Sequence, residues 1–202
     1  MVSPMHTTCE RDCLRRLADR KQHLAETPEN RDRLARWQAF DAEDAPRAMV
    51  LFETGGVLDE LLPVAALQCR DPWARGQERR LRREIFQFEQ VRDDSVIDPA
   101  IHFNWRVEKS DYGVATVQHR ADNEGRLGAR RWDPPIADLD RDFGKLRPRT
   151  FRVDRDATQA EEERLRACFG DILPVERRGS FWWTMGMTIV AIDLIGLERL
   201  ML

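Results

Sequence analysis

The most apolar stretch of the chain is its last, "GSFWWTMGMTIVAIDLIGLERLML", in which residues 181–192 carry no charge. Asp193 interrupts the stretch, and Glu198 and Arg199 follow. A membrane-spanning helix needs about 18 or more apolar residues in a row, so a span is not expected. The stretch is therefore expected to bury its apolar side against protein. It forms either a helix that docks on the core of this chain or part of a fold that further elements complete.

Composition places the chain among globular proteins of one domain or slightly more. It has 202 residues, of which 34% are charged and 42% hydrophobic, and its net charge of -3 argues against nucleic-acid binding. The four cysteines, at positions 9, 13, 69 and 168, form no C-x-x-C pair, and the N-terminus "MVSPMHTTCERD" lacks the apolar core of a signal peptide. We expect a cytoplasmic protein with reduced thiols and no membrane partner.

Helical periodicity is clear at the start of the chain. It predicts a helix over 9–25 and a second one that runs to about Phe40, with Thr27 as its cap and Pro28 at its first position. Both helices precede the first predicted strand. Residues 1–44 are therefore expected to form an N-terminal helical extension, and 45–202 the main domain.

Three apolar runs predict strands, namely Met49–Phe52, "SVI" at 95–97 and "DILPVERRG" at 171–179. Met49–Phe52 is apolar without a break, as strands buried on both faces of a parallel sheet are. Alternation and a Tyr-Gly turn in "VEKSDYGVATVQHRAD" predict a hairpin in the stretch between His102 and Trp132.

Helices are predicted between and after these strands. They cover 71–92, a short stretch between the prolines of "DPPIADLDRDFGKLRP", a helix capped by Asp156 and ended by Gly170, and a last helix from about Ser180. The alternation of strands and helices is typical of an α/β fold with a parallel sheet. A (β/α)₈ barrel takes roughly 250 residues, so three strands correspond to about its first half.

Three segments of the chain resemble the N-terminal part of the uroporphyrinogen decarboxylase superfamily. They are "RAMVLFETGGVL", "DDSVIDPAI" and "GDILPVERRGSFWWT", placed like barrel strands and the turns that follow them. This superfamily of TIM-barrel enzymes also includes corrinoid-dependent methyltransferases. The resemblance covers residues 45–202 and implies an incomplete (β/α)₈ barrel with a hairpin insert. The last helix would then pack against barrel strands that a truncated chain lacks.

The resemblance implies that Asp98 is the catalytic residue. In the decarboxylases, the corresponding carboxylate accepts hydrogen bonds from pyrrole N–H groups and stabilises the positive charge that develops on protonation of a pyrrole carbon. A carboxylate suits both roles because it only accepts hydrogen bonds and carries negative charge. Asp before Pro is also a common turn former, so Asp98 has a purely structural alternative.

The same comparison implies a substrate-binding role for Glu53, Thr54 and Gly56, which follow the first predicted strand. Glu53 stands where the decarboxylases place an arginine that meets substrate carboxylates. A glutamate there repels a carboxylate by on the order of 1 kcal/mol or more at short range. A substrate other than a porphyrinogen is therefore expected, or else Glu53 is an exposed loop residue.

Further substrate-binding candidates are His102, Arg177 and Trp183. Glu176, Arg177 and Arg178 stand at the end of the third predicted strand, where an arginine can bind a carboxylate or phosphate through two hydrogen bonds or can simply be solvated. Trp183 either lines a pocket or partner surface or packs against the N-terminal helices. His102 has no neighbours at metal-ligand spacing, so no metal site is expected in this chain.

Two functions remain open. The first is an enzyme or a truncated piece of one that acts on a small molecule, either by decarboxylation without a cofactor or by methyl transfer to or from a corrinoid. Methyl transfer implies a corrinoid protein, a complete barrel and a zinc ion outside this chain. Further expected partners are a second barrel fragment or a second copy of the chain. The alternative is a non-catalytic α/β module that binds a partner through its apolar C-terminal helix. Nucleotide-binding loops and serine-hydrolase motifs are absent from the sequence.

Overall fold

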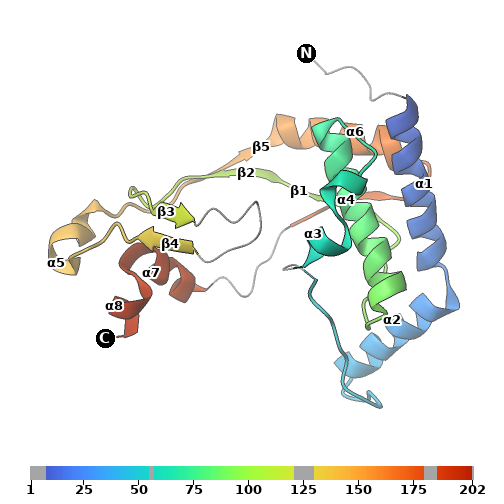
Figure 1. The fold of residues 1–202 in the computed structure, drawn as a ribbon, viewed down its shortest axis with the longest axis horizontal. Coiled ribbons are helices and arrows are strands. Elements are labelled where there is room, and N and C mark those ends of the chain that lie inside the picture. Colours follow the sequence, from blue (N-terminus) through green and yellow to red (C-terminus); the bar gives the residue numbers. More distant parts are fainter. Residues whose placement is uncertain (1–7, 55–56, 121–129, 180–185, 202) are drawn as a thin grey trace. The chain divides into compact units, whose positions relative to one another are not determined.

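The computed structural model describes most of the chain as helices, short strands and connecting loops (Figure 1). The described residues are 8–54, 57–120, 130–179 and 186–201. They contain both helices and small sheets, which confirms a mixed α/β protein.

The chain divides into two compact units that each hold separate stretches of sequence. Unit 1 comprises Met1–Phe103 and Gln159–Arg177, and unit 2 comprises Asn104–Thr158 and Arg178–Leu202. The expected boundary between residues 44 and 45 stays a prediction.

Two long helices open unit 1 as the periodicity predicts. They are α1, Thr8–Ala25, and α2, Pro28–Asp41. The Thr27 hydroxyl accepts the backbone N–H of Asn30 at 3.3 Å, and Pro28 occupies the first helical position. The first N–H groups of a helix have no partner within the helix; the Thr27 hydroxyl binds one of them, and Pro28 has no N–H group to satisfy.

The predicted helix over 71–92 is also present. It consists of α4, Pro72–Phe86, which continues as the π-helix η2, Gln87–Val91. The Asp71 carboxylate caps α4 by accepting the N–H of Ala74 at 3.0 Å. The short helices α3, Leu58–Leu61, and η1, Val64–Ala66, lie between α2 and α4 in the sequence.

A two-stranded sheet lies in the core of unit 1. Strand β1, Ile101–Asn104, pairs with β6, Val175–Arg178, so the predicted third strand is confirmed. Helix α6, Arg155–Phe169, precedes β6. The core residues come from α1, the loop before α4, α4, β1, α6 and β6, and include Leu14, Cys69, Leu81, Ile101, Leu165, Phe169 and Val175.

The ends of α6 differ slightly from expectation. Asp154 rather than Asp156 caps the helix, because its Oδ1 accepts the N–H of Ala157 at 2.9 Å. Gly170 follows the last turn and donates its N–H to the carbonyl of Arg166 at 2.9 Å. A Cβ at Gly170 would lie 2.7 Å from that carbonyl oxygen, so the close approach requires glycine.

The strand predicted at Met49–Phe52 is wrong. The N–H groups of Val50 and Phe52 donate to the carboxylates of Asp94 and Asp93, both at 2.8 Å, instead of to a neighbouring strand. The side chains from Val50 to Phe52 are each 57–58% exposed, so the expected burial on both faces is wrong as well.

The strand predicted at residues 95–97 is wrong for a similar reason. Asn30 of α2 donates to the carbonyl of Ile97 at 3.0 Å and accepts its N–H at 2.9 Å. The side chain of a helix residue therefore satisfies the backbone groups that a sheet would otherwise use.

Unit 2 contains two antiparallel strand pairs, where a parallel sheet was expected for the chain. Strand β2, Arg106–Lys109, pairs with β5, Phe151–Asp154. Strand β3, Val117–Arg120, pairs with β4, Arg130–Asp133. The hairpin predicted within "VEKSDYGVATVQHRAD" is wrong, because its two halves, β2 and β3, pair with β5 and β4 instead of with each other. At the proposed turn, the carbonyl of Tyr112 accepts the N–H of Arg147 from a later segment at 2.7 Å.

The short helix predicted between prolines is present as α5, Leu139–Asp142, followed by η3, Phe143–Lys145. The apolar closing stretch forms α7, Met187–Ile195, and α8, Leu197–Met201. The helices separate at Gly196, whose φ of 86° favours glycine. The predicted helix start near Ser180 lies outside the described residues.

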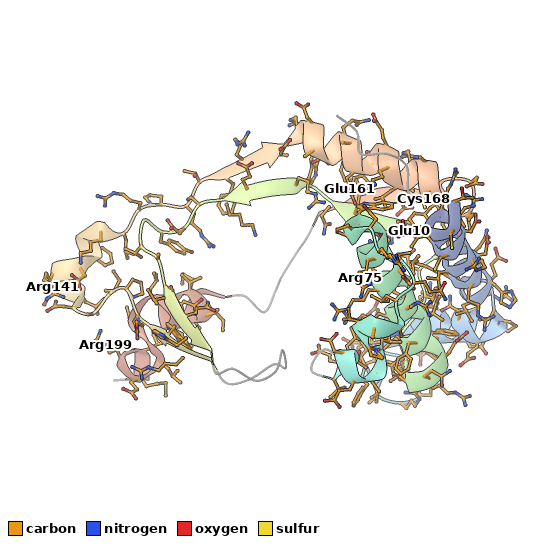
Figure 2. The ribbon with its side chains drawn as sticks, turned by 45° about the horizontal axis from the view of Figure 1, so that its top comes forward. Glu10, Arg75, Arg141, Glu161, Cys168 and Arg199 are labelled. Atoms are coloured by element: carbon orange, nitrogen blue, oxygen red, sulfur yellow. The ribbon has the colours of Figure 1, made fainter. Side chains whose placement is uncertain are left out.

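The closing helices contact the segment that follows β4. Leu194 accepts the N–H of Ile136 at 3.0 Å, and Arg199 donates to the carbonyl of Ile136 at 3.0 Å (Figure 2). Met187 and Met201 nevertheless stay 89% and 77% exposed. In the part of the chain that the structure describes, none of the helices has both the length and the apolar character needed to cross a bilayer.

Asp94 holds the irregular segment after α2 in place. Its buried carboxylate accepts two hydrogen bonds from Arg47, at 2.5 and 2.7 Å, and the N–H of Val50. These bonds, led by that to Arg47, keep the pKa of Asp94 well below its ordinary value. The ionised carboxylate therefore contributes stability above its unfolded pKa of about 3.9, and this contribution fades as the pH falls from there towards the folded pKa.

We predict that Asp94→Asn lowers the free energy of unfolding by about 2 kcal/mol at neutral pH, because hydrogen bonds to a charged group are lost. Urea denaturation of the two proteins at about pH 7 and about pH 3 measures this difference, which should shrink at the lower pH. The exposed Asp44→Asn is the matched control and should leave the midpoint unchanged. Equal stability of Asp94→Asn and the parent protein at neutral pH would contradict the assignment.

Candidate functional site

The alternation of β1 positions a histidine beside the core. Ile101 and Phe103 are buried in the core of unit 1. Successive side chains of a strand point to opposite faces. His102 therefore lies on the other face, where its side chain is 25% exposed.

The imidazole of His102 lies between two carboxylates. Its Nε2 is 2.8 Å from Oδ2 of Asp98, and its Nδ1 is 3.6 Å from Oε2 of Glu176. Asp98 comes from the loop before β1, and Glu176 comes from the paired strand β6. We call Asp98, His102 and Glu176 the acid–imidazole site. Both carboxylates are about half exposed, so solvent reaches the site.

Two arginines belong to the surroundings of this site. Arg80 of α4 donates from Nη1 to the carbonyl of His102 at 2.7 Å. Arg177 follows Glu176 on β6, and its Nη1 lies 3.8 Å from a carboxylate oxygen of Glu162. Arg80 therefore lies beside the backbone of His102, whereas alternation along β6 places Arg177 on the face opposite to Glu176.

Three buried polar atoms of this region have no hydrogen-bond partner among the described residues. They are Oε1 of Gln77, Nε of Arg80 and Nδ1 of His102. Gln77 and Arg80 lie one turn apart on α4. Nε of Arg80 and Nδ1 of His102 each lie 3.6 Å from a carboxylate oxygen, of Glu84 and Glu176, which is too long for a hydrogen bond.

The structure brings together part of the predicted site. Asp98 and His102 are in direct contact, and Arg177 stands on the strand beside them. Glu53 is exposed in a loop, as its structural alternative holds. Thr54 is buried, and its hydroxyl lies 3.4 Å from Oε1 of Gln87, which it can reach as a donor.

Gly56 and Trp183 lie outside the described residues. Sequence reasoning gave no role to Arg80, because only the fold brings its guanidinium group to the carbonyl of His102. Glu176 was expected at a strand end, but its position beside His102 was not predicted. The i, i+4 spacing of Asp98 and His102 was the one local signal of this site.

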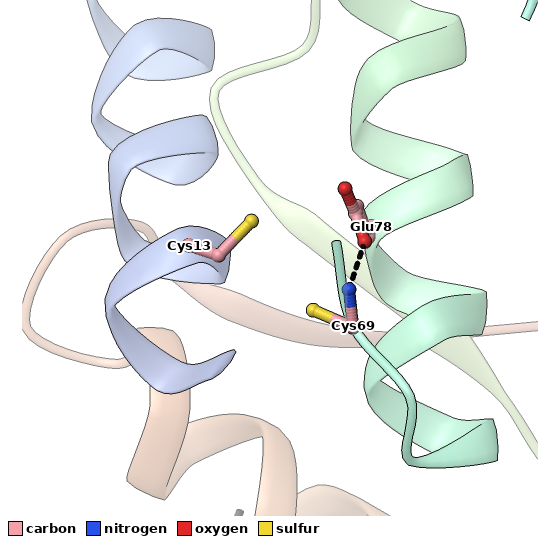
Figure 3. A group of neighbouring side chains, drawn as sticks. All are labelled: Cys13, Cys69 and Glu78. Atoms are coloured by element: carbon pink, nitrogen blue, oxygen red, sulfur yellow. Dashed lines mark hydrogen bonds between the residues drawn. The ribbon is translucent and has the colours of Figure 1, made fainter. Parts of the chain in front are cut away.

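A second group of reactive side chains lies in the core of unit 1. Cys13 of α1, Cys69 before α4 and Glu78 of α4 each offer one ligand atom, and these atoms lie within 4.8 Å of one another (Figure 3). All three residues are buried. We call them the thiol–carboxylate cluster. No sequence motif announced it, because its members come from three separate segments.

The charges of this cluster are defined by burial and hydrogen bonds. Burial raises the pKa of the Cys13 and Cys69 thiols, and the nearby Glu78 carboxylate raises it further. Burial also raises the pKa of Glu78, but bonds from the N–H groups of Gln68 and Cys69 and from Arg82 outweigh it, so that the net shift is downward. At neutral pH the cluster therefore holds two thiols and one carboxylate.

Comparisons of the chain with protein-family models, with curated proteins and with solved structures find no match. The candidate site is therefore argued from its own geometry.

Thiol reactivity tests the placement of the four cysteines. Cys9 is exposed, whereas Cys13, Cys69 and Cys168 are buried. Burial raises the pKa of Cys168 to about 11, so its reactive thiolate is scarce at neutral pH. We predict that iodoacetamide modifies Cys9 alone in the native protein and all four cysteines in urea, as peptide mass spectrometry will show. Cys9→Ser should abolish the native reaction; modification of Cys69 or Cys168 as fast as Cys9 would contradict their burial.

Proposed function

We propose that the chain is an enzyme, or part of one, that decarboxylates a small organic acid at the acid–imidazole site. The observation that carries the proposal is the position of the His102 ring between the carboxylates of Asp98 and Glu176. Such a ring, bonded to Asp98 at Nε2, with Glu176 3.6 Å from Nδ1 and both carboxylates open to solvent, is suited to proton transfer.

Decarboxylation needs one proton at the carbon that loses carbon dioxide. The bond between this carbon and the carboxylate breaks, carbon dioxide leaves, and the electron pair remains on the carbon, which then takes up a proton. Nδ1 of His102 is buried. The proton therefore reaches the substrate through the carboxyl group of Asp98 or Glu176, and His102 replaces it. While His102 holds the proton, the Asp98 carboxylate stabilises the imidazolium through its 2.8 Å contact with Nε2.

The surrounding charges favour an acid as the substrate. Arg80, which donates to the carbonyl of His102, supplies a guanidinium group that can pair with a carboxylate. The exposed Glu53, in place of the arginine of the decarboxylases, supports a substrate other than a porphyrinogen.

The resemblance extends this proposal to the fold. The chain would supply the first strands and helices of a (β/α)₈ barrel, and the antiparallel pairs of unit 2 would be its insert. The exposed apolar side chains from Val50 to Phe52 would be covered by such further elements. A second barrel fragment or further sequence would provide the remaining strands.

Methyl transfer is the other chemistry of the superfamily. It would need a corrinoid protein and a zinc ion that activates a thiol. That zinc ion would lie outside this chain. Decarboxylation is the reaction we propose because it needs only the carboxylates and the imidazole of the acid–imidazole site.

A non-catalytic role remains the second candidate. The exposure of Met187 and Met201 on the closing helices favours a module that binds a partner, or a second copy of the chain, through this surface. The two proposals make different demands, since only the first requires the acid–imidazole site to act on a substrate.

We predict that the purified chain releases carbon dioxide from at least one member of a panel of small mono- and dicarboxylic acids. Asp98→Asn should lower the rate by about 100-fold or more, because an amide neither relays a proton nor stabilises an imidazolium. Release of labelled carbon dioxide measures both rates.

The matched control is Asp12→Asn, which changes an exposed aspartate of α1. It should retain the parental rate. A folded chain that acts on none of the acids, or an Asp98→Asn protein as active as the parent, overturns the decarboxylase proposal; the first of these results favours the partner-binding module.

A further inference from the structure

We propose that Cys13, Cys69 and Glu78 bind a structural zinc ion in the core of unit 1. This site is independent of the acid–imidazole site and of the function proposed for it. The ion would join helix α1, the loop before α4 and helix α4, which Figure 3 shows converging on the cluster.

The three ligand atoms are of types that zinc binds, and they lie close to the spacing of a tetrahedral site. Zinc binds thiolate sulfur at about 2.3 Å and carboxylate oxygen at about 2.0–2.2 Å, mostly in tetrahedral geometry. The two sulfur atoms and the carboxylate oxygen lie within 4.8 Å of one another, so shifts of about 1 Å bring them to a common centre. Two thiolates favour zinc over magnesium or calcium.

A rigid frame holds the cluster before any metal binds. Glu78 accepts the N–H groups of Gln68 and Cys69 at 2.8–3.0 Å. The next residue of the loop, Arg70, donates its N–H to the carboxylate of Glu10 of α1 at 2.6 Å. Arg75 donates to the carbonyl of Cys69 at 3.0 Å. The loop that carries Cys69 is therefore fixed to both helices, as the outer groups of metal sites commonly fix their ligands.

The charges of a zinc-bound cluster balance. Zinc would form bonds to both sulfur atoms and to a Glu78 oxygen, and the two thiol protons would pass to solvent. Two thiolates and Glu78 then carry three negative charges against the two positive charges of zinc. Arg82, whose Nε donates to Glu78 at 2.8 Å, supplies the remaining positive charge.

Burial makes this a structural site rather than a catalytic one. The Cys69 and Glu78 side chains are fully buried, so no substrate reaches them. The carbonyl oxygen of Glu10, which accepts the S–H of Cys69 at 4.0 Å, or a water molecule would be the fourth ligand of a tetrahedral ion.

Cobalt(II) provides the test, because tetrahedral thiolate ligation gives it strong visible and near-ultraviolet absorption. The full chain, reduced and freed of metal with a chelator, is titrated with cobalt(II) and then with zinc(II). We expect one equivalent of cobalt to produce the thiolate charge-transfer band and zinc to remove it. Zinc binding in weak buffer should release about two protons for each chain.

Cys69→Ser is expected to lose the charge-transfer band or to weaken it to about half with at least a tenfold loss of affinity. Cys168→Ser is the matched control, because Cys168 lies in the same core but outside the cluster (Figure 2). It should bind cobalt like the parent. If Cys69→Ser fails to fold, the cobalt titration of the parent and the number of protons that it releases on zinc binding still test the proposal. A folded parent without the band, or loss of the band in Cys168→Ser, overturns the proposal.

Discussion

The pairing of β1 with β6 over the apolar core of unit 1 is the constraint on which the candidate site depends. Ile101 is fully buried and donates its N–H to the carbonyl of Pro174 at 2.8 Å, which sets the register of the two segments. Because side chains alternate along β1, burial of Ile101 places His102 on the other face. The neighbouring strand then brings Glu176 to its second ring nitrogen. The position of His102 in the acid–imidazole site is thus set by the burial of the neighbouring Ile101.

Buried carboxylates organise the loops around this core. Glu78 and Glu10 fix the loop before α4, and Asp94 fixes the segment after α2, each by accepting backbone N–H groups. A buried charge is tolerated only where it is paired, and arginines provide the pairing for Glu78 and Asp94. The same arrangement leaves two thiols facing one carboxylate, which is what makes a metal site chemically reasonable at this position.

The sequence predicted the local elements well and the long-range contacts poorly. Periodicity and caps located α1, α2, α4 and α6, because these signals lie within the helices themselves. An apolar run alone suggested a strand at Met49–Phe52, but carboxylates more than forty residues further along the chain take up its N–H groups. Asp98 and His102 are only four residues apart, so the sequence can suggest their contact. Glu176 and the thiol–carboxylate cluster depend on tertiary packing that no spacing reveals.

The amide hydrogen of Ile101 offers the most direct test of this account. Its bond to Pro174 lies in the β1–β6 pair, inside the apolar core. If this pairing positions the site, native-state hydrogen exchange followed by NMR will find the Ile101 amide among the slowest of the chain, exchanging only on unfolding of unit 1. Exchange as fast as that of an exposed loop amide, such as that of Leu51, would contradict the pairing and with it the placement of His102 between its carboxylates.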